Sequence, residues 1–89
     1  MPVVLIPTAY RGPTQGQAEI NVPVGSVISA LEAVEAAHPG FLPQVVDPSG
    51  NVHRFVKLFI NEAQIDSAAL DTRLGDSDRL EVLAAIAGG

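Results

Sequence analysis

The sequence predicts a single α+β domain in which a mixed β-sheet covers one main helix. Three observations lead to this prediction. The chain has 89 residues, which suits one domain with one core. Hydrophobic residues make up 47% of it and charged residues 17%, a balance typical of globular proteins. One stretch has helical periodicity, and the stretches around it have strand composition, in the order β-β-α-β-β-β.

The first two strands are expected to form an antiparallel hairpin. Residues 3–6 are a β-branched and aliphatic run between two prolines, short enough to be a strand that is apolar on both faces. Residues 10–16 contain glycines and a proline, which favour a turn. Residues 17–22 alternate polar and apolar side chains, which is typical of a half-buried strand.

The main helix is expected to begin after Ser26, a residue type that suits the N-cap. Val27, Leu31 and Val34 follow at helical spacing, with alanines between them, and predict an apolar face against the sheet. Residues 38–40, His-Pro-Gly, predict the end of the helix. Proline disfavours helical geometry in the residue before it, and glycine permits a left-handed exit.

A second antiparallel hairpin is expected after a connecting segment. Residues 41–51 contain two prolines and a Ser-Gly-Asn turn, and they predict an irregular connection. Residues 55–60 and 64–66 have strand composition, with a tight turn predicted at residues 61–63.

The end of the domain is predicted to be its last long strand. Residues 71–74 predict a brief helical turn, residues 75–78 a loop, and residues 79–84 the strand. The first and last long strands are apolar enough to lie side by side in the middle of the sheet, which gives the β-grasp arrangement of ubiquitin-like domains. We therefore expect a β-grasp domain over residues 1–83 and a flexible diglycine tail over residues 84–89.

The composition excludes several classes of function. The chain has no cysteine, which removes disulfides, thiolate metal sites and thiol nucleophiles. Its formal net charge of −5 disfavours binding to nucleic acid and favours basic protein partners. No segment resembles a signal peptide or reaches the roughly 18 apolar residues of a spanning helix. We expect a cytoplasmic protein that does not bind membranes and is a monomer on its own.

Side-chain patterns within the domain predict no catalytic, metal-binding or cofactor-binding residue. No acidic residue at ligand spacing makes His38 or His53 a plausible metal site, and both are expected to be structural or solvated. Asp71, Asp76 and Asp78 lack the spacing of a calcium loop and are expected to form a solvated turn. The serines lack a nucleophile-elbow context, and the glycines build no phosphate loop.

The last two residues are the clearest functional signal. The chain ends in Gly88-Gly89 after the uncharged residues 83–87. Without a side chain beside it, the terminal carboxylate can enter a narrow active site, so this ending favours an acyl handle. The alternatives are a frayed terminus or a chain cut at a flexible point.

Several short motifs point to a known family. They are Gly25-Ser26-Val27, His53-Arg54-Phe55-Val56, Ile60-Asn61, Leu74-Gly75-Asp76 and Ala85-Ile86-Ala87-Gly88-Gly89. On these motifs nearly the whole chain resembles the ThiS/MoaD-like, ubiquitin-fold sulfur-carrier proteins, and within them it is most similar to the CysO type of cysteine biosynthesis. Many relatives have a proline shortly before the ending, where this chain has alanines, so the tail is expected to be less stiff.

The resemblance implies that the chemistry takes place at Gly89. In the family, an E1-like enzyme uses ATP to adenylate the terminal glycine, and a sulfur donor displaces AMP to leave a thiocarboxylate. Gly88 and Ala87 would give the tail access to the partner's channel. ATP would be bound by this activating partner, and the sulfur would go to a biosynthetic enzyme that makes cysteine or another sulfur-containing metabolite. The chain would then be a protein co-substrate and not an enzyme.

Strand alternation predicts a docking face for these partners. If alternate residues of the 55–60 strand face the helix, the others face outward beside the last strand. The outward residues are then Phe55, Lys57, Phe59, Arg79, Glu81 and Leu83. Phe55, Phe59 and Leu83 are expected to form an apolar patch that leads to the tail, with Arg79 beside it, and such patches commonly mark partner sites. The alternative is that a loop covers these rings as ordinary core.

Two other functions remain open at this point. In the first, the chain is a ubiquitin-like modifier, and the activated Gly89 ends in an isopeptide bond to a lysine of another protein. In the second, it is a non-covalent β-grasp interaction module whose tail is inert.

Overall fold

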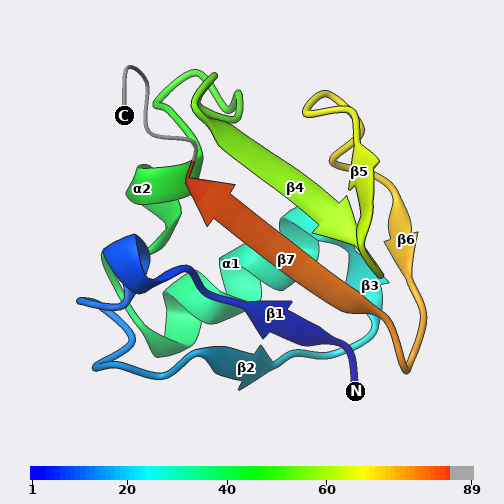
Figure 1. Cartoon of the computed structure of the whole chain (residues 1–89), viewed down its shortest axis with the longest axis horizontal. Helices are drawn as coiled ribbons and strands as arrows, with labels where there is room; N and C mark the ends of the chain where they lie inside the picture. The colour runs from blue at the N-terminus through cyan, green and yellow to red at the C-terminus, as the bar shows by residue number, and fades with distance from the viewer. Residues whose placement is uncertain (85–89) are drawn as a thin grey trace.

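A five-stranded sheet wraps around helix α1 in the computed structural model, which describes residues 1–84 (Figure 1). Its strands are β1 (Val3–Leu5), β2 (Glu19–Asn21), β4 (Val56–Ile60), β5 (Ala63–Ile65) and β7 (Arg79–Ala84). They lie in the order β2-β1-β7-β4-β5; β1 and β7 are parallel, and the other neighbours are antiparallel. The predicted β-grasp sheet is confirmed, with the first and last long strands adjacent.

Helix α1 (Val27–Ala37) begins where the capping signal predicted. The hydroxyl of Ser26 accepts a hydrogen bond from the Ser29 N–H at 3.2 Å, and the hydroxyl of Ser29 accepts one from the Ser26 N–H at 2.8 Å. This reciprocal cap satisfies two backbone donors at the start of the helix. Position 25 must be glycine for this cap, because a Cβ there would collide with the Ser29 hydroxyl.

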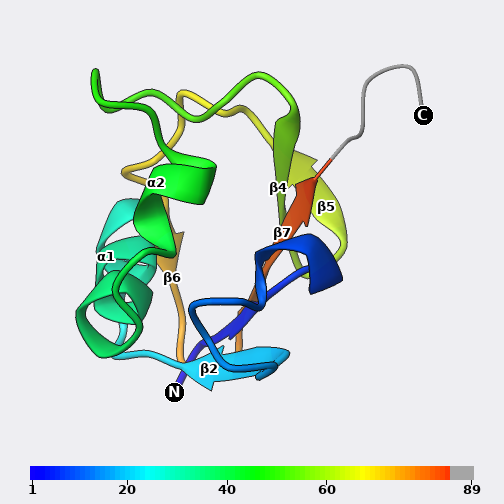
Figure 2. The same cartoon turned by 90° about the vertical axis from the view of Figure 1, so that its left-hand side faces the viewer.

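The core lies between α1 and the concave face of the sheet (Figure 2). The helix contributes Val27, Ala30, Leu31 and Val34, all of which are buried. The sheet contributes Val4, Ile20, Val56, Leu58, Leu80 and Val82. Each of these strand residues alternates with an outward neighbour, so the inner and outer faces of the sheet are defined by burial as well as by sequence.

The connection over residues 41–51 is more regular than the sequence predicted. Leu42–Val45 form a one-turn helix, α2, because Phe41 and Val45 are both fully buried and hold the turn against the core. Pro43 lies in the first turn of α2, where its missing N–H breaks no helical hydrogen bond. The prediction of irregular structure is therefore wrong for this turn.

The predicted helical turn at residues 71–74 is also wrong. Arg73–Leu74 form strand β6, which pairs with the two-residue strand β3 (Gly25–Ser26) in a small second sheet. The backbone continues this contact, since the Val27 N–H donates to the Thr72 carbonyl at 2.8 Å. Leu74 is buried, and its position in the core favours the extended backbone.

Smaller differences occur in the loops of the two hairpins. The first loop contains a short 3-10 helix, η1 (Thr8–Tyr10), which carries Tyr10 into the core. The second turn comprises only Asn61 and Glu62, whose φ angles are 50° and 73°. Two left-handed residues give the tight turn that suits the twist of paired strands, so β5 already begins at Ala63.

The strand β7 includes the first residue of the predicted tail. Ala84 pairs with Val56 of β4, so the strand extends one residue past the predicted domain limit at residue 83. The other tail residues, 85–89, lie outside the described residues. Among residues 1–84, no helix has the length and apolar character needed to cross a membrane.

Candidate functional site

β7 is the last described element before Gly88 and Gly89 in the sequence. Its first residues pair with β1 on one side, through the Val3–Arg79 and Leu5–Glu81 partners. Its last two residues pair only with β4, through Lys57–Leu83 and Val56–Ala84. The predicted reactive residue Gly89 and the access residues Gly88 and Ala87 lie outside the described residues, so Ala84 is the one residue of the predicted tail that the structure describes.

The alternation predicted for β4 is confirmed. Val56 and Leu58 are buried on the inner face, and Ile60 is half-buried. Lys57 is exposed on the outer face, and Phe59 is half-buried there opposite Glu81. The outer face of the sheet therefore carries apolar and charged side chains together, next to the end of β7.

The candidate docking residues differ in how far they are exposed. Phe55 and Leu83 have 44% and 38% of their surface exposed, and Arg79 is exposed as well. The side chain of Phe59 is half-buried, which is more than predicted. This burial agrees in part with the alternative that the ring belongs to the core. Arg79 forms an ion pair with Glu19, with 3.6 Å between Nη2 and Oε2. Their role in docking stays a prediction.

A hollow of about 460 Å³ opens on the outer face beside Leu83. Leu5, Glu81 and Leu83 contribute to its lining from β1 and β7, and Arg11 reaches it from the first loop. The Arg11 Nε–H donates to the Ile6 carbonyl at 3.0 Å, which orients the guanidinium. Sequence reasoning missed Arg11, because strand periodicity carries no information about side chains that come from loops.

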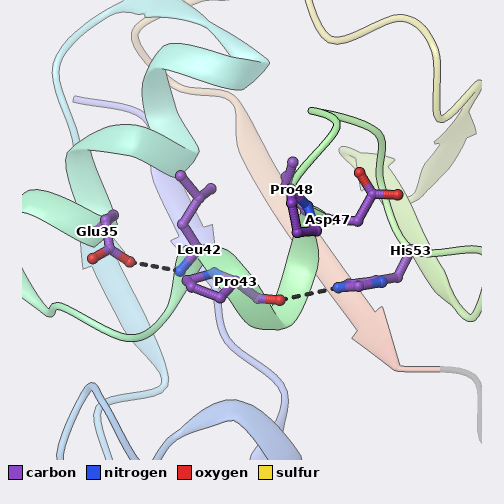
Figure 3. Close-up of a pocket in the computed structure, with 7 residues that line it drawn as sticks. Glu35, Leu42, Pro43, Asp47, Pro48 and His53 are labelled. Carbon is purple, nitrogen blue, oxygen red and sulfur yellow. Dashed lines mark hydrogen bonds between the residues drawn. The ribbon is translucent and has the colours of Figure 1, made fainter.

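His53 links this face to α2. Its ring stacks on Phe55, which lies directly before β4, with 5.2 Å between the ring centroids. Its Nε2–H donates to the Pro43 carbonyl of α2 at 3.0 Å (Figure 3). The structural role expected for His53 is therefore confirmed, but Phe55 is oriented by this stack and not by the alternation of a strand.

Glu35 joins the end of α1 to the start of α2. Its carboxylate accepts hydrogen bonds from the Leu42 N–H at 2.8 Å and from the Gly40 N–H at 3.1 Å. His38, the C-cap of α1, donates its backbone N–H to the Val34 carbonyl at 2.7 Å. These bonds fix the position of α2 and of the Pro43 carbonyl that His53 binds.

Asp76 and Asp78, two of the three aspartates expected to form a solvated turn, lie in a hydrogen-bonded turn. Asp78 accepts the Gly75 N–H at 2.7 Å and the Asn61 side-chain amide at 2.8 Å, and these bonds hold the pKa of Asp78 below its ordinary value. Asp76 forms an ion pair of 3.0 Å with the N-terminal ammonium of Met1. Within the described part of the chain, no group of three or more His, Asp and Glu side chains is placed to hold a metal ion.

Comparisons with known proteins agree with this geometry. The model of the ThiS family matches residues 4–89. The sulfur carrier protein CysO of Mycobacterium tuberculosis is 34% identical over 89 residues, which cover 97% of this chain and 96% of that protein. A chain in the crystal structure of the Amycolatopsis orientalis BexX/CysO complex superposes with a TM-score of 0.90 at 29% identity, covering 100% of both chains. The crystal structure of M. tuberculosis CysO gives a TM-score of 0.87 at 30% identity, covering 97% of this chain and 100% of that one. The chain therefore belongs to the ThiS family.

Proposed function

We propose that this chain is a sulfur-carrier protein whose terminal Gly89 is adenylated and then converted to a thiocarboxylate that donates sulfur in biosynthesis. The observation that carries the proposal is the family match, which extends through the final Gly88-Gly89. The 34% identity to a sulfur carrier protein CysO over nearly the full chain supports it.

The chemistry requires an activating partner. A terminal carboxylate is ionised at neutral pH and is a poor electrophile. In the proposed reaction, a carboxylate oxygen of Gly89 attacks the α-phosphorus of ATP and pyrophosphate leaves. Hydrosulfide, or sulfur delivered at the same oxidation level, then attacks the acyl carbon and AMP leaves, which gives the thiocarboxylate. The chain itself binds no cofactor in this proposal, and an E1-like enzyme holds the ATP.

The body of the chain serves recognition. The tail starts at the end of β7, and Leu83 and Phe55 are exposed near that end. Apolar side chains beside charges of both signs, such as Lys57 and Glu81, suit a partner surface that combines apolar groups with complementary charges of both signs. The solved Amycolatopsis neighbour is a complex of BexX and CysO, which supports a protein partner for this chain too. A second enzyme accepts the sulfur, and both reactions take place in the cytoplasm in this proposal.

Intact-mass analysis tests the proposal. The chain is isolated from its native cell, and it is also incubated with the E1-like enzyme, ATP and a sulfur donor. The expected result is a mass that corresponds to exchange of one oxygen for sulfur. A chain that lacks Gly88 and Gly89 is the control and should keep its mass. Conjugates ending in Gly-Gly on lysines would indicate a protein modifier instead, and an unmodified chain in both samples would contradict activation.

A further inference from the structure

Two hollows adjoin on the helix side of the molecule, and His53, which stacks on Phe55, lines the first of them. One has a volume of about 570 Å³ and is shown in Figure 3. The other has a volume of about 620 Å³. They share the wall formed by Leu42, Val46, Asp47 and Pro48. Figure 2 shows α1 and α2 on one side of the molecule and β4 and β7 on the other. We call the two hollows together the α2 groove.

The walls of the α2 groove are largely apolar. Leu42 and Val46 separate the two hollows and are half-buried, so part of each side chain faces the groove. Ile28 and Leu70 line the second hollow and are half-buried too. Aliphatic walls of this kind gain free energy when an apolar side chain replaces water against them.

The charged side chains of the α2 groove all have the same sign. Glu35 and Asp47 line the first hollow, and Glu32, Asp47 and Asp71 line the second. None of the chain's 5 Lys and Arg residues lines either hollow. The hollow on the outer face of the sheet differs, because Arg11 and Arg79 line it together with acidic residues.

Two of these carboxylates are held in place before any partner binds. Glu35 accepts backbone N–H groups at the end of α1, as described above. The Oδ1 atom of Asp47 accepts the Ser49 N–H at 2.9 Å and the Asn51 N–H at 3.0 Å. Groups fixed in this way lose little conformational freedom when a cation approaches, which favours binding. Glu32 and Asp71 are exposed, and no ion pair engages them within residues 1–84.

We propose that the α2 groove docks a segment of a protein partner in which aliphatic side chains are flanked by Lys or Arg. The aliphatic side chains enter the hollows, and the cations lie against Glu32, Asp47 and Asp71. Charge complementarity of this kind selects the partner. The same carboxylates repel nucleic acid and anionic lipid. This inference goes beyond the proposed function, because none of the residues that line the α2 groove comes from β4 or β7.

An NMR titration of the uniformly ¹⁵N-labelled chain tests the inference. The probe is the peptide acetyl-KLKLK-amide. Saturable shifts are expected at the amides of Val46, Asp47 and Ala68, with little change at Lys57 and Leu83. The peptide acetyl-KGKGK-amide keeps the charge without the leucines and should bind at least fivefold more weakly, and acetyl-ELELE-amide should not bind. Shifts centred on β4 and β7, equal binding of the glycine peptide, or no shifts at all would overturn the proposal.

Two matched double variants test whether peptide binding depends on the groove or on the overall negative charge. Combining Glu32→Gln with Asp71→Asn removes two exposed carboxylates of the groove and should weaken binding of acetyl-KLKLK-amide about fivefold. Combining Glu19→Gln with Glu62→Gln removes the same charge from the other side and should leave the affinity unchanged. If both double variants lost the same affinity for the peptide, the effect would come from net charge alone, and the proposal of a specific groove would be refuted. A chain without Gly88 and Gly89 should bind the peptide normally, so the α2 groove and the sulfur-carrier function can fail independently.

Discussion

The imidazole of His53 and the ring of Phe55 stack with their planes 12° apart. The His53 Nε2–H also binds the Pro43 carbonyl, so one side chain connects α2 to the start of β4. Val56, the residue after Phe55, pairs with Ala84, the last described residue. The exposed ring of Phe55 is thus oriented close to Ala84, the end of the described part of β7.

Replacing His53 by alanine should release Phe55. The change removes the stack and one hydrogen bond, and we expect the free energy of unfolding to fall by about 1–2 kcal/mol. Chemical denaturation measures the loss, and the aromatic NMR signals of Phe55 report its orientation. His38→Gln is the control, because the hydrogen bond that His38 donates comes from its backbone N–H. Unchanged Phe55 signals in His53→Ala would show that the stack does not orient this ring.

Replacing Leu83 by alanine should weaken binding to the activating enzyme more than it weakens folding. Leu83 is 38% exposed, so truncation should cost less than about 1 kcal/mol of stability, while loss of a docking contact reduces affinity about tenfold or more. Phe59→Ala should also weaken binding more than folding, but its cost in stability should be larger because Phe59 is half-buried. Calorimetric titration and denaturation measure the two effects.

Val24→Ala is the matched control for this face. Val24 is 55% exposed and precedes β3, which pairs with β6 in the small second sheet and not with β4 or β7. Its replacement should change neither affinity nor stability. Comparable losses of binding and folding in Phe59→Ala would assign Phe59 to the core and not to the docking face.

Replacing Gly88 by valine should block activation without unfolding the domain. A branched side chain would thicken the tail in the partner's channel, and position 88 follows the last strand, β7, in the sequence. We expect a normal circular dichroism spectrum and loss of adenylation, measured by pyrophosphate release. Ala85→Val adds a similar side chain farther from Gly89 and should retain more activity. Adenylation of Gly88→Val at the wild-type rate would refute the requirement for a thin tail.

Asp78 should make folding sensitive to acid. The hydrogen bond from the Gly75 N–H lowers the pKa of Asp78 in the folded chain below its ordinary value of 3.8, and the hydrogen bond from the Asn61 amide has a smaller effect in the same direction. Its contribution to stability is therefore complete above pH 3.8 and is lost as the pH falls through the lower folded value. Urea denaturation between pH 5 and pH 2 should show a smaller pH dependence in Asp78→Asn. Ser77→Ala, an exposed change in the same loop that removes no carboxylate, should keep the wild-type slope.

Replacing Tyr10 by phenylalanine should leave stability unchanged or raise it by up to about 1 kcal/mol. The hydroxyl of Tyr10 is buried and has no hydrogen-bond partner among the described residues, and burial raises its pKa. Removing the hydroxyl therefore removes a desolvation cost without breaking a bond. Tyr10→Ala should instead cost about 3–5 kcal/mol through loss of the buried ring. A large destabilisation by phenylalanine, measured by urea denaturation, would reveal a partner of the hydroxyl.

The parts of the fold that the sequence predicted correctly rest on local signals. Ser26 caps α1 through atoms three residues away, and β4 shows its inner and outer faces in its own alternation. The parts that it missed depend on distant contacts. β6 is a strand only because Gly25 and Ser26 pair with it, and α2 forms because Phe41 and Val45 are buried under other elements.

The residues of the candidate site also divide into those that local sequence predicted and those that depend on distant contacts. Outward exposure of Leu83 follows from strand alternation, and Gly89 is proposed as the reacting residue from the terminal sequence alone. Arg11 and the stacked pair of His53 and Phe55 come from loops, where no periodicity reports direction. The α2 groove depends on a helix that local sequence did not predict.

The pairing of β7 has a mechanical consequence for a protein that is held by its end. If a partner holds the body of the domain and pulls its C-terminal end in the direction of β7, the force acts along the axis of that strand. The backbone hydrogen bonds to β4 run across that axis, from Leu80 to Ala84, so the load falls on all of them at once and not on one after another. The domain therefore resists being unzipped by traction on the same end through which it is proposed to deliver its cargo.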